Sequence, residues 1–122
     1  MYRILILIMM HIAADFILQG NRLYKLKASK TGFLLAHVGI YTIFFIVFSP
    51  LLLELTFVQG LVFSAINGGA HLIVDFFTSK FKKLYWQKNE AKYIAVISID
   101  HVLHISILMG TYIYMYPQLL AG

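Results

Sequence analysis

Long apolar runs separated by short polar connections make up most of the chain. Four of these runs approach the roughly 20 helical residues that cross the hydrocarbon core of a bilayer. We place the corresponding helices at residues 2–19, 32–48, 51–77 and 93–116. The pattern therefore predicts an all-α, polytopic membrane protein in which residues 1–122 form a single four-transmembrane-helix bundle.

The composition also favours lipid over water as the surrounding medium. Hydrophobic residues make up 61% of the chain and charged residues only 12%, whereas soluble domains are about a quarter charged. The net charge of +5 does not predict nucleic-acid binding, because the basic residues form no soluble basic face. We expect the lysines to contact anionic lipid headgroups instead. The chain has no cysteine, which excludes disulfides and thiolate metal sites.

The positions of the basic residues predict the orientation of the bundle. Between the first two helices and between the last two lie Arg22, Lys25, Lys27, Lys30, Lys80, Lys82, Lys83, Lys88 and Lys92. The other connection and the C-terminal tail contain no lysine or arginine. By the positive-inside rule, both basic loops face the cytoplasm and both termini face outside, in the cytoplasmic (inner) membrane. Arg3 is the exception. Asp15 and the absence of a small-residue cleavage site favour a retained first helix over a signal peptide.

Histidine and aspartate recur at helical spacing inside the apolar runs. His11 lies four residues before Asp15, and the same pair returns 60 residues later as His71 and Asp75. Residues four apart share one face of a helix. The repetition suggests a duplicated two-helix unit, in which equivalent residues lie at equal depth in the membrane.

The two other helices carry a similar polar face. His37 precedes Tyr41 by four residues, and Asp100 precedes His104 by four. A charged side chain inside a membrane costs about 2.5 to 3.5 kcal/mol on the insertion scale, so these groups are expected to face one another. With a rise of about 1.5 Å per residue, all four helices bring such a group to one layer in the cytoplasmic half of the bilayer.

This combination of side chains predicts a metal site. Imidazole nitrogens and carboxylate oxygens without sulfur suit a divalent metal such as zinc or manganese better than soft copper. The candidate ligands are His11, Asp15, His37, His71, Asp75, Asp100 and His104. Seven ligands exceed the need of one tetrahedral ion, so either two metals are held or some of these groups orient ligating histidines. The candidates for orienting the ligands, without binding the metal themselves, are Gln19, Tyr41 and Asn67.

Three functions agree with such a site. The first is metal-dependent hydrolysis of a lipid-linked ester or phosphoester at the cytoplasmic interface, in which a metal with an open position activates water. In this scheme the expected nitrogen ligands are His11, His71 and His104. Asp15, Asp75 and Asp100 would ligate or act as general base, and His37 would stabilise charge on the substrate. The second is a small proton or metal-ion transporter or channel subunit, which favours a homo-oligomer. The third is a structural or regulatory membrane protein with a buried His–Asp network.

The chain resembles a family of small bacterial and phage integral membrane proteins catalogued as domain of unknown function 3307. The resemblance rests on the segments HIAADFILQ, LLAHVGIY, HLIVDF and IDHVLH and extends over nearly the whole chain. It implies the same helical membrane fold and the same histidines and aspartates as site residues. His101 stands where glutamine is usual in that family. A more distant resemblance is to proteins labelled membrane-bound metal-dependent hydrolases.

Overall fold

The computed structural model describes residues 2–17 and 31–119 of the chain. Helices and short turns account for both stretches, and neither contains a β-strand, which confirms the predicted all-α class. The elements in order are α1 (Tyr2–Ile12), a π-helical segment (Ala13–Ile17), α3 (Thr31–Leu53), α4 (Phe57–Tyr85), α5 (Glu90–Met115) and a 3-10 turn (Pro117–Leu119).

Three of these helices are long and apolar enough to cross a membrane: α3 from Gly32, α4 and α5, with 22, 29 and 26 residues. The prediction of a membrane protein is supported by these three, but the prediction of four spans is not. In the part of the chain that the structure describes, α1 has 11 residues and the π-helical segment five, short of the roughly 20 that a span needs. The first basic loop lies outside the described residues, so the orientation in the membrane stays a prediction.

The turn between α3 and α4 lies later in the chain than predicted. The sequence pattern ended a helix at Phe48, before Pro50, whereas α3 continues through Pro50 to Leu53. A proline inside a membrane helix is tolerated where neighbouring groups satisfy the freed backbone. The helix ends where Glu54 adopts a left-handed backbone conformation, φ 58°.

A capping box then starts α4 at Phe57, not at Leu51 as predicted. The Gln59 backbone N–H donates to Thr56 Oγ1 at 3.1 Å, and the Thr56 N–H donates to Gln59 Oε1 at 2.9 Å. This reciprocal pair satisfies two backbone donors that the first turn of a helix leaves without partners. The sequence Thr-Phe-Val-Gln carries this signal, which the apolar pattern had obscured.

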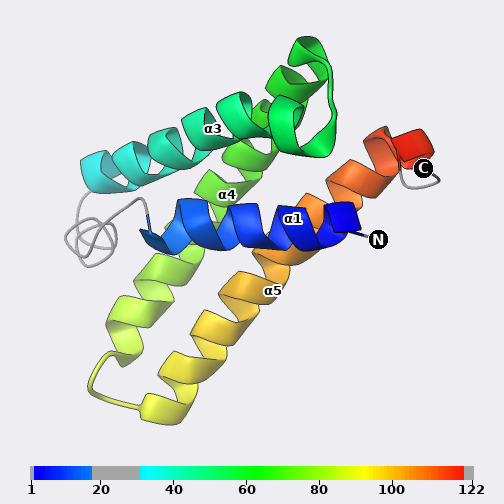
Figure 1. Cartoon of the computed structure of the whole chain (residues 1–122). Coiled ribbons are helices and arrows are strands. Elements are labelled where there is room, and N and C mark those ends of the chain that lie inside the picture. The colour runs from blue at the N-terminus through cyan, green and yellow to red at the C-terminus, as the bar shows by residue number, and fades with distance from the viewer. Residues whose placement is uncertain (1, 18–30, 120–122) are drawn as a thin grey trace.

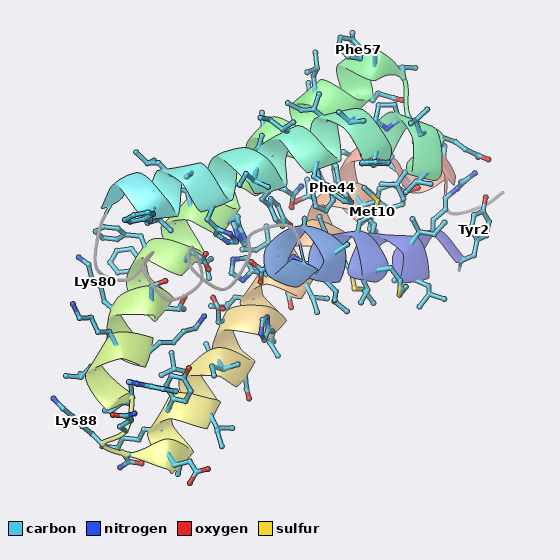
Figure 2. All side chains as sticks on the ribbon, turned by 60° about the vertical axis from the view of Figure 1, so that its left-hand side comes forward. Tyr2, Met10, Phe44, Phe57, Lys80 and Lys88 are labelled. Carbon is cyan, nitrogen blue, oxygen red and sulfur yellow. The ribbon has the colours of Figure 1, made fainter. Side chains whose placement is uncertain are left out.

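Helices α4 and α5 form an antiparallel hairpin that is longer than predicted (Figure 1). Helix α4 extends beyond the predicted end at Phe77 to Tyr85, and α5 begins at Glu90 instead of Tyr93. The Asn89 side chain caps α5 by accepting from the Lys92 N–H at 3.0 Å. The lysines predicted in the second basic loop therefore lie mostly on helices. Figure 2 places Lys80 and Lys88 at the end of the hairpin opposite Phe57.

Helices α1 and α3 both cross this hairpin at an angle, as Figure 1 shows. Helix α3 packs against α4, while α1 contacts α3 and α5. Two glycines allow the close approach of α3 to α4. A Cβ at Gly60 would lie 2.7 Å from Pro50 Cγ, and a Cβ at Gly68 would collide with Thr42 Oγ1. Small residues at a helix contact are typical of membrane proteins, and this contact positions the polar face of α4 against α3.

The apolar core adjoins the buried histidines and aspartates. It contains residues from all four α-helices, among them Leu7, Phe45, Phe63, Leu108 and Tyr112, each fully buried. Many large apolar side chains elsewhere are exposed on the helices, as expected where lipid replaces water around a helix bundle. The polar residues are thus enclosed between the helices and face one another instead of the surrounding lipid.

Candidate metal centre

The structure brings all seven predicted ligands into the interior. Each is at most 4% exposed: His11, Asp15, His37, His71, Asp75, Asp100 and His104. They come from every helical segment that the sequence assigned to them, namely α1, the π-helical segment, α3, α4 and α5. Buried ionisable groups are costly unless they are paired or hold a metal, so their convergence needs a physical reason. Their roles as ligands stay predictions.

Four donor atoms from three segments meet at the centre of this group. His37 Nε2 lies 3.0 Å from Asp15 Oδ1, 3.1 Å from Asp75 Oδ2 and 2.9 Å from His71 Nε2. His71 Nε2 lies 3.5 Å from each of the same two carboxylate oxygens. All four atoms lie within 4.8 Å of one another. We call Asp15, His37, His71 and Asp75 the central group.

Five of the six separations, between 2.9 and 3.5 Å, are close to the edge lengths of a tetrahedral coordination shell. A regular tetrahedron with corners about 3.2 Å apart has its centre about 2 Å from each corner, which is close to the zinc–imidazole and zinc–carboxylate bond lengths of about 2.0 to 2.2 Å. Two carboxylates and two imidazoles also bring two negative charges together in a buried place. A divalent cation would neutralise them. The central group therefore could hold a metal ion in a site with the usual ligand count and size.

The π-helical segment sets the position of Asp15. As the i, i+4 spacing predicted, His11 and Asp15 lie on the same side of the segment, with His11 Nε2 and Asp15 Oδ2 4.0 Å apart. The backbone changes from α to π geometry at Ala13, and the other oxygen of Asp15, Oδ1, lies 3.0 Å from His37 Nε2 on α3. Single π-helical turns are frequent at functional sites. The sequence pattern contained no signal for this change.

Asp100 lies in a separate ion pair beside the central group. Its Oδ2 accepts a hydrogen bond from Lys82 Nζ, and its Oδ1 accepts one from Thr78 Oγ1, both at 2.7 Å. Lys82 is itself only 8% exposed. These two hydrogen bonds join α4 to α5, and so does the approach of His104 Nε2 on α5 to Asp75 Oδ1 on α4 at 3.6 Å. A carboxylate already neutralised by a buried lysine is better suited to orienting a neighbouring histidine than to binding a cation.

Sequence reasoning missed Lys82 and Thr78 as members of the site. It assigned Lys82 to a cytoplasmic loop that binds lipid headgroups. The helical period would have identified both residues, because His71, Asp75, Thr78 and Lys82 follow the spacing of one buried helix face. The exposed lysines on either side, Lys80 and Lys83, do not share it.

The chain belongs to a known family. The family model described as "Protein of unknown function (DUF3307)" matches residues 4–120. This confirms the resemblance found in the motifs, and the match includes every candidate ligand. No curated protein and no solved structure matches the chain. The more distant resemblance to membrane-bound hydrolases stays a prediction.

In this DUF3307 protein the predicted supporting residues differ in what they contact. The Tyr41 hydroxyl lies 3.1 Å from His11 Nδ1, and its ring stacks on that of His71 at 4.1 Å with an interplanar angle of 3°. Asn67 is buried, but its amide donates to the Phe63 carbonyl of its own helix at 3.0 Å. Gln19 lies outside the described residues. Tyr41 is thus the predicted supporting residue that the structure places against two candidate ligands.

His101 has an intermediate position. It is half-buried, and it can form a metal-binding group with His11 and Asp15. A further possible group contains Asp75, Asp100 and His104. Each of these two groups shares one carboxylate with the central group. The polar cluster is therefore continuous across the helices.

Proposed function

We propose that the protein holds a divalent metal ion in the central group, within the membrane. The observation that supports this is the distance of 2.9 to 3.5 Å from the two imidazole nitrogens to each other and to the two carboxylate oxygens, which come from three different segments. A purely hydrogen-bonded network would pair each donor with one acceptor. Here two imidazoles and two carboxylates direct four atoms at one point, where a single proton cannot satisfy them all.

The ligand types favour zinc or manganese. Two nitrogens with two carboxylate oxygens form a borderline to hard donor set, and the distances suit an ion with bonds of about 2 Å. Calcium needs six to eight oxygen ligands at longer distances, which this group does not offer. Copper(I) is unsuited because there is no sulfur ligand.

For the reaction, we propose hydrolysis of a lipid-linked ester or phosphoester at the cytoplasmic interface. A divalent metal supplies Lewis acidity and activates water near neutral pH. Asp15 and Asp75 would serve as ligands of the metal, and Lys82 with Asp100 would keep His104 in place. Lys80, Lys83 and Lys88 are exposed on the same end of the hairpin, and Asp75 is only about 10 Å along the helix from Lys82. An anionic headgroup held by these lysines would lie near the site.

A second candidate function is transport of a metal ion or proton. It is favoured by the complete set of four protein ligands in the central group, because catalytic sites usually keep one position open whereas closed sites retain the ion. A transport protein would use the same ligands to hold an ion halfway along its path. A homo-oligomer would supply the additional helices that a conduit needs.

Elemental analysis of the detergent-purified protein tests the metal proposal. We expect at least one zinc or manganese ion per chain in the wild type and its loss in His37→Ala. The matched control is His101→Ala, which leaves the central group complete and should keep the ion. A folded wild-type protein that takes up no divalent metal from a saturating dialysis would refute the proposal and favour the structural network.

The two functions are then separated by activity. Release of fatty acid or phosphate from vesicles of phosphatidylglycerol and phosphatidic acid measures hydrolysis. Entry of zinc into proteoliposomes that contain a zinc-sensitive dye measures transport. Metal-dependent release that is absent in His37→Ala supports hydrolysis, and flux without release supports transport.

A further inference from the structure

The two carboxylates of the central group each have a second oxygen that faces a different histidine. Asp75 directs Oδ2 at His37 and Oδ1 at His104 Nε2, which is 3.6 Å away. Asp15 directs Oδ1 at His37 and Oδ2 at His11 Nε2, at 4.0 Å. A carboxylate that presents its two oxygens to two sets of imidazoles has the arrangement of a bridge between two cations.

His11 and His104 lie outside the central group, and we call them the outer histidines. Each has a ring nitrogen that could bind a metal ion. His104 Nδ1 lies 2.8 Å from the backbone carbonyl oxygen of Asp100, and since a carbonyl only accepts, Nδ1 carries the proton. In the neutral ring, Nε2 is then unprotonated and points at Asp75 with a free lone pair. This Nε2 is buried and has no hydrogen-bond partner in the described part of the chain. A buried acceptor left in this state is costly.

His11 is held in a similar way from the opposite side. Its Nδ1 contacts the Tyr41 hydroxyl at 3.1 Å, which leaves Nε2 directed at Asp15. Among the described residues this Nε2 also lacks a hydrogen-bond partner. The rings of His11 and His104 stack at 5.4 Å, so the two outer histidines lie side by side, next to the central group.

The geometry points to a second divalent cation beside the first, between His11 and His104, with Asp15 and Asp75 bridging the two ions. This inference rests on the proposed metal site and deepens it. The first ion takes its nitrogens from α3 and α4, and the second from α1 and α5. Two-metal sites with ions about 3.5 to 4 Å apart are suited to hydrolysis of phosphoesters, because they stabilise both the attacking and the leaving oxygen.

Asp100 has a positioning role in this arrangement. Its carbonyl fixes the tautomer of His104, and its carboxylate is occupied by Lys82 and Thr78. A histidine ligand that donates its other N–H to an oxygen is the usual arrangement behind a metal. The second cation is thus expected to depend on His104 itself more than on the carboxylate of Asp100.

The test is the number and coupling of manganese ions bound by the full chain in detergent. After dialysis against excess Mn²⁺ and removal of free metal, we expect two ions per chain and the electron paramagnetic resonance spectrum of an exchange-coupled pair. His104→Ala should bind one ion and give the six-line spectrum of isolated Mn²⁺. Gly69→Ala is the matched control, because a Cβ there would meet nothing within 4 Å, and it should keep two coupled ions. Circular dichroism of every variant checks that the protein is folded. His104→Gln is a second variant that removes the imidazole, for use if His104→Ala does not fold.

Each result has one meaning. A single ion in the wild type, or two ions without coupling, overturns the bridged pair but leaves the central site intact. Loss of the second ion in Gly69→Ala but not in His104→Ala also overturns it. No bound Mn²⁺ and no bound Zn²⁺ in the folded wild type refutes the central site as well, and with it the proposed function.

Discussion

The contact between Gly68 and Thr42 allows a direct test of how helix packing controls the proposed metal centre. We consider the substitution Gly68→Ala, which adds one methyl group. The new Cβ would collide with Thr42 Oγ1 and would also lie 3.2 Å from its Cγ2 and 3.3 Å from its Cβ. Rotating the threonine side chain cannot relieve all three contacts, because its Cβ does not move with the rotation. Helix α3 must therefore shift away from α4.

The size of the shift follows from these contacts. With the hydroxyl rotated away, Thr42 must still retreat by a few tenths of an ångström to bring its Cγ2 and Cβ to ordinary van der Waals distance. His37, which lies on the same helix, would move away from His71 by a similar amount, which approaches the limit of about 0.5 Å that a working site tolerates. We expect overpacking to cost about 1 to 3 kcal/mol of stability. The affinity for metal should fall about 10-fold, or about 1.4 kcal/mol.

The assay is competition for Zn²⁺ against a fluorescent chelator, together with thermal unfolding in detergent. Gly69→Ala is the matched control, because a Cβ at Gly69 meets nothing within 4 Å. The double variant Gly68→Ala/Thr42→Ala removes the collision and should regain most of the affinity. Equal affinities for Gly68→Ala, Gly69→Ala and the wild type would refute the link between this helix contact and the site.

Three further predictions concern single contacts. Lys82→Met leaves the carboxylate of Asp100 buried without its cation and should cost about 3 to 5 kcal/mol, which thermal unfolding measures; adding Asp100→Asn should recover part of the loss. Tyr41→Phe removes the hydroxyl that contacts His11 and should weaken binding of the second proposed cation, which His11 would hold, about 10- to 100-fold, as measured by chelator competition. Thr56→Ala removes a helix cap and should cost about 1 kcal/mol, whereas Thr56→Ser should be near neutral in the same unfolding assay.

These predictions fail in distinguishable ways. An unchanged melting temperature in Lys82→Met would mean that Asp100 finds another partner or is not charged. Unchanged metal affinity in Tyr41→Phe would mean that the hydroxyl does not hold His11 in position. If Thr56→Ser destabilises the protein as much as Thr56→Ala, the capping hydrogen bond is not the cause.

Much of the site could be predicted because ionisable side chains in an apolar chain are stable only where they face the interior of the helix bundle. His11, Asp15, His71 and Asp75 lie at helical spacing inside runs that lipid would surround, and the cost of exposing them there forces them inward. This reasoning needs only the period of the helix. The same reasoning placed His37, on another helix, in the same interior.

The remaining features depend on contacts between helices or on local backbone geometry, which a periodic pattern does not contain. The π-helical turn at Asp15 changes the direction of one carboxylate, and nothing in Ala13–Ile17 marks it. Pro50 suggested a helix end, but α3 continues through it to Leu53. Lys82 was assigned to a loop because the cluster of lysines was interpreted as the end of the helix, without asking how far the helical period continues. Its burial follows from the extension of α4 to Tyr85.

The shortness of α1 has a consequence for how the protein is assembled. This helix has 11 residues, yet it and the turn that follows supply His11 and Asp15. The hairpin of α4 and α5, with α3 packed against it, has its own extensive contacts. We therefore expect the three long helices to come together first and the N-terminal segment to dock last, fastened by the cation. Amide hydrogen exchange should then be fastest in α1 when the metal is stripped away.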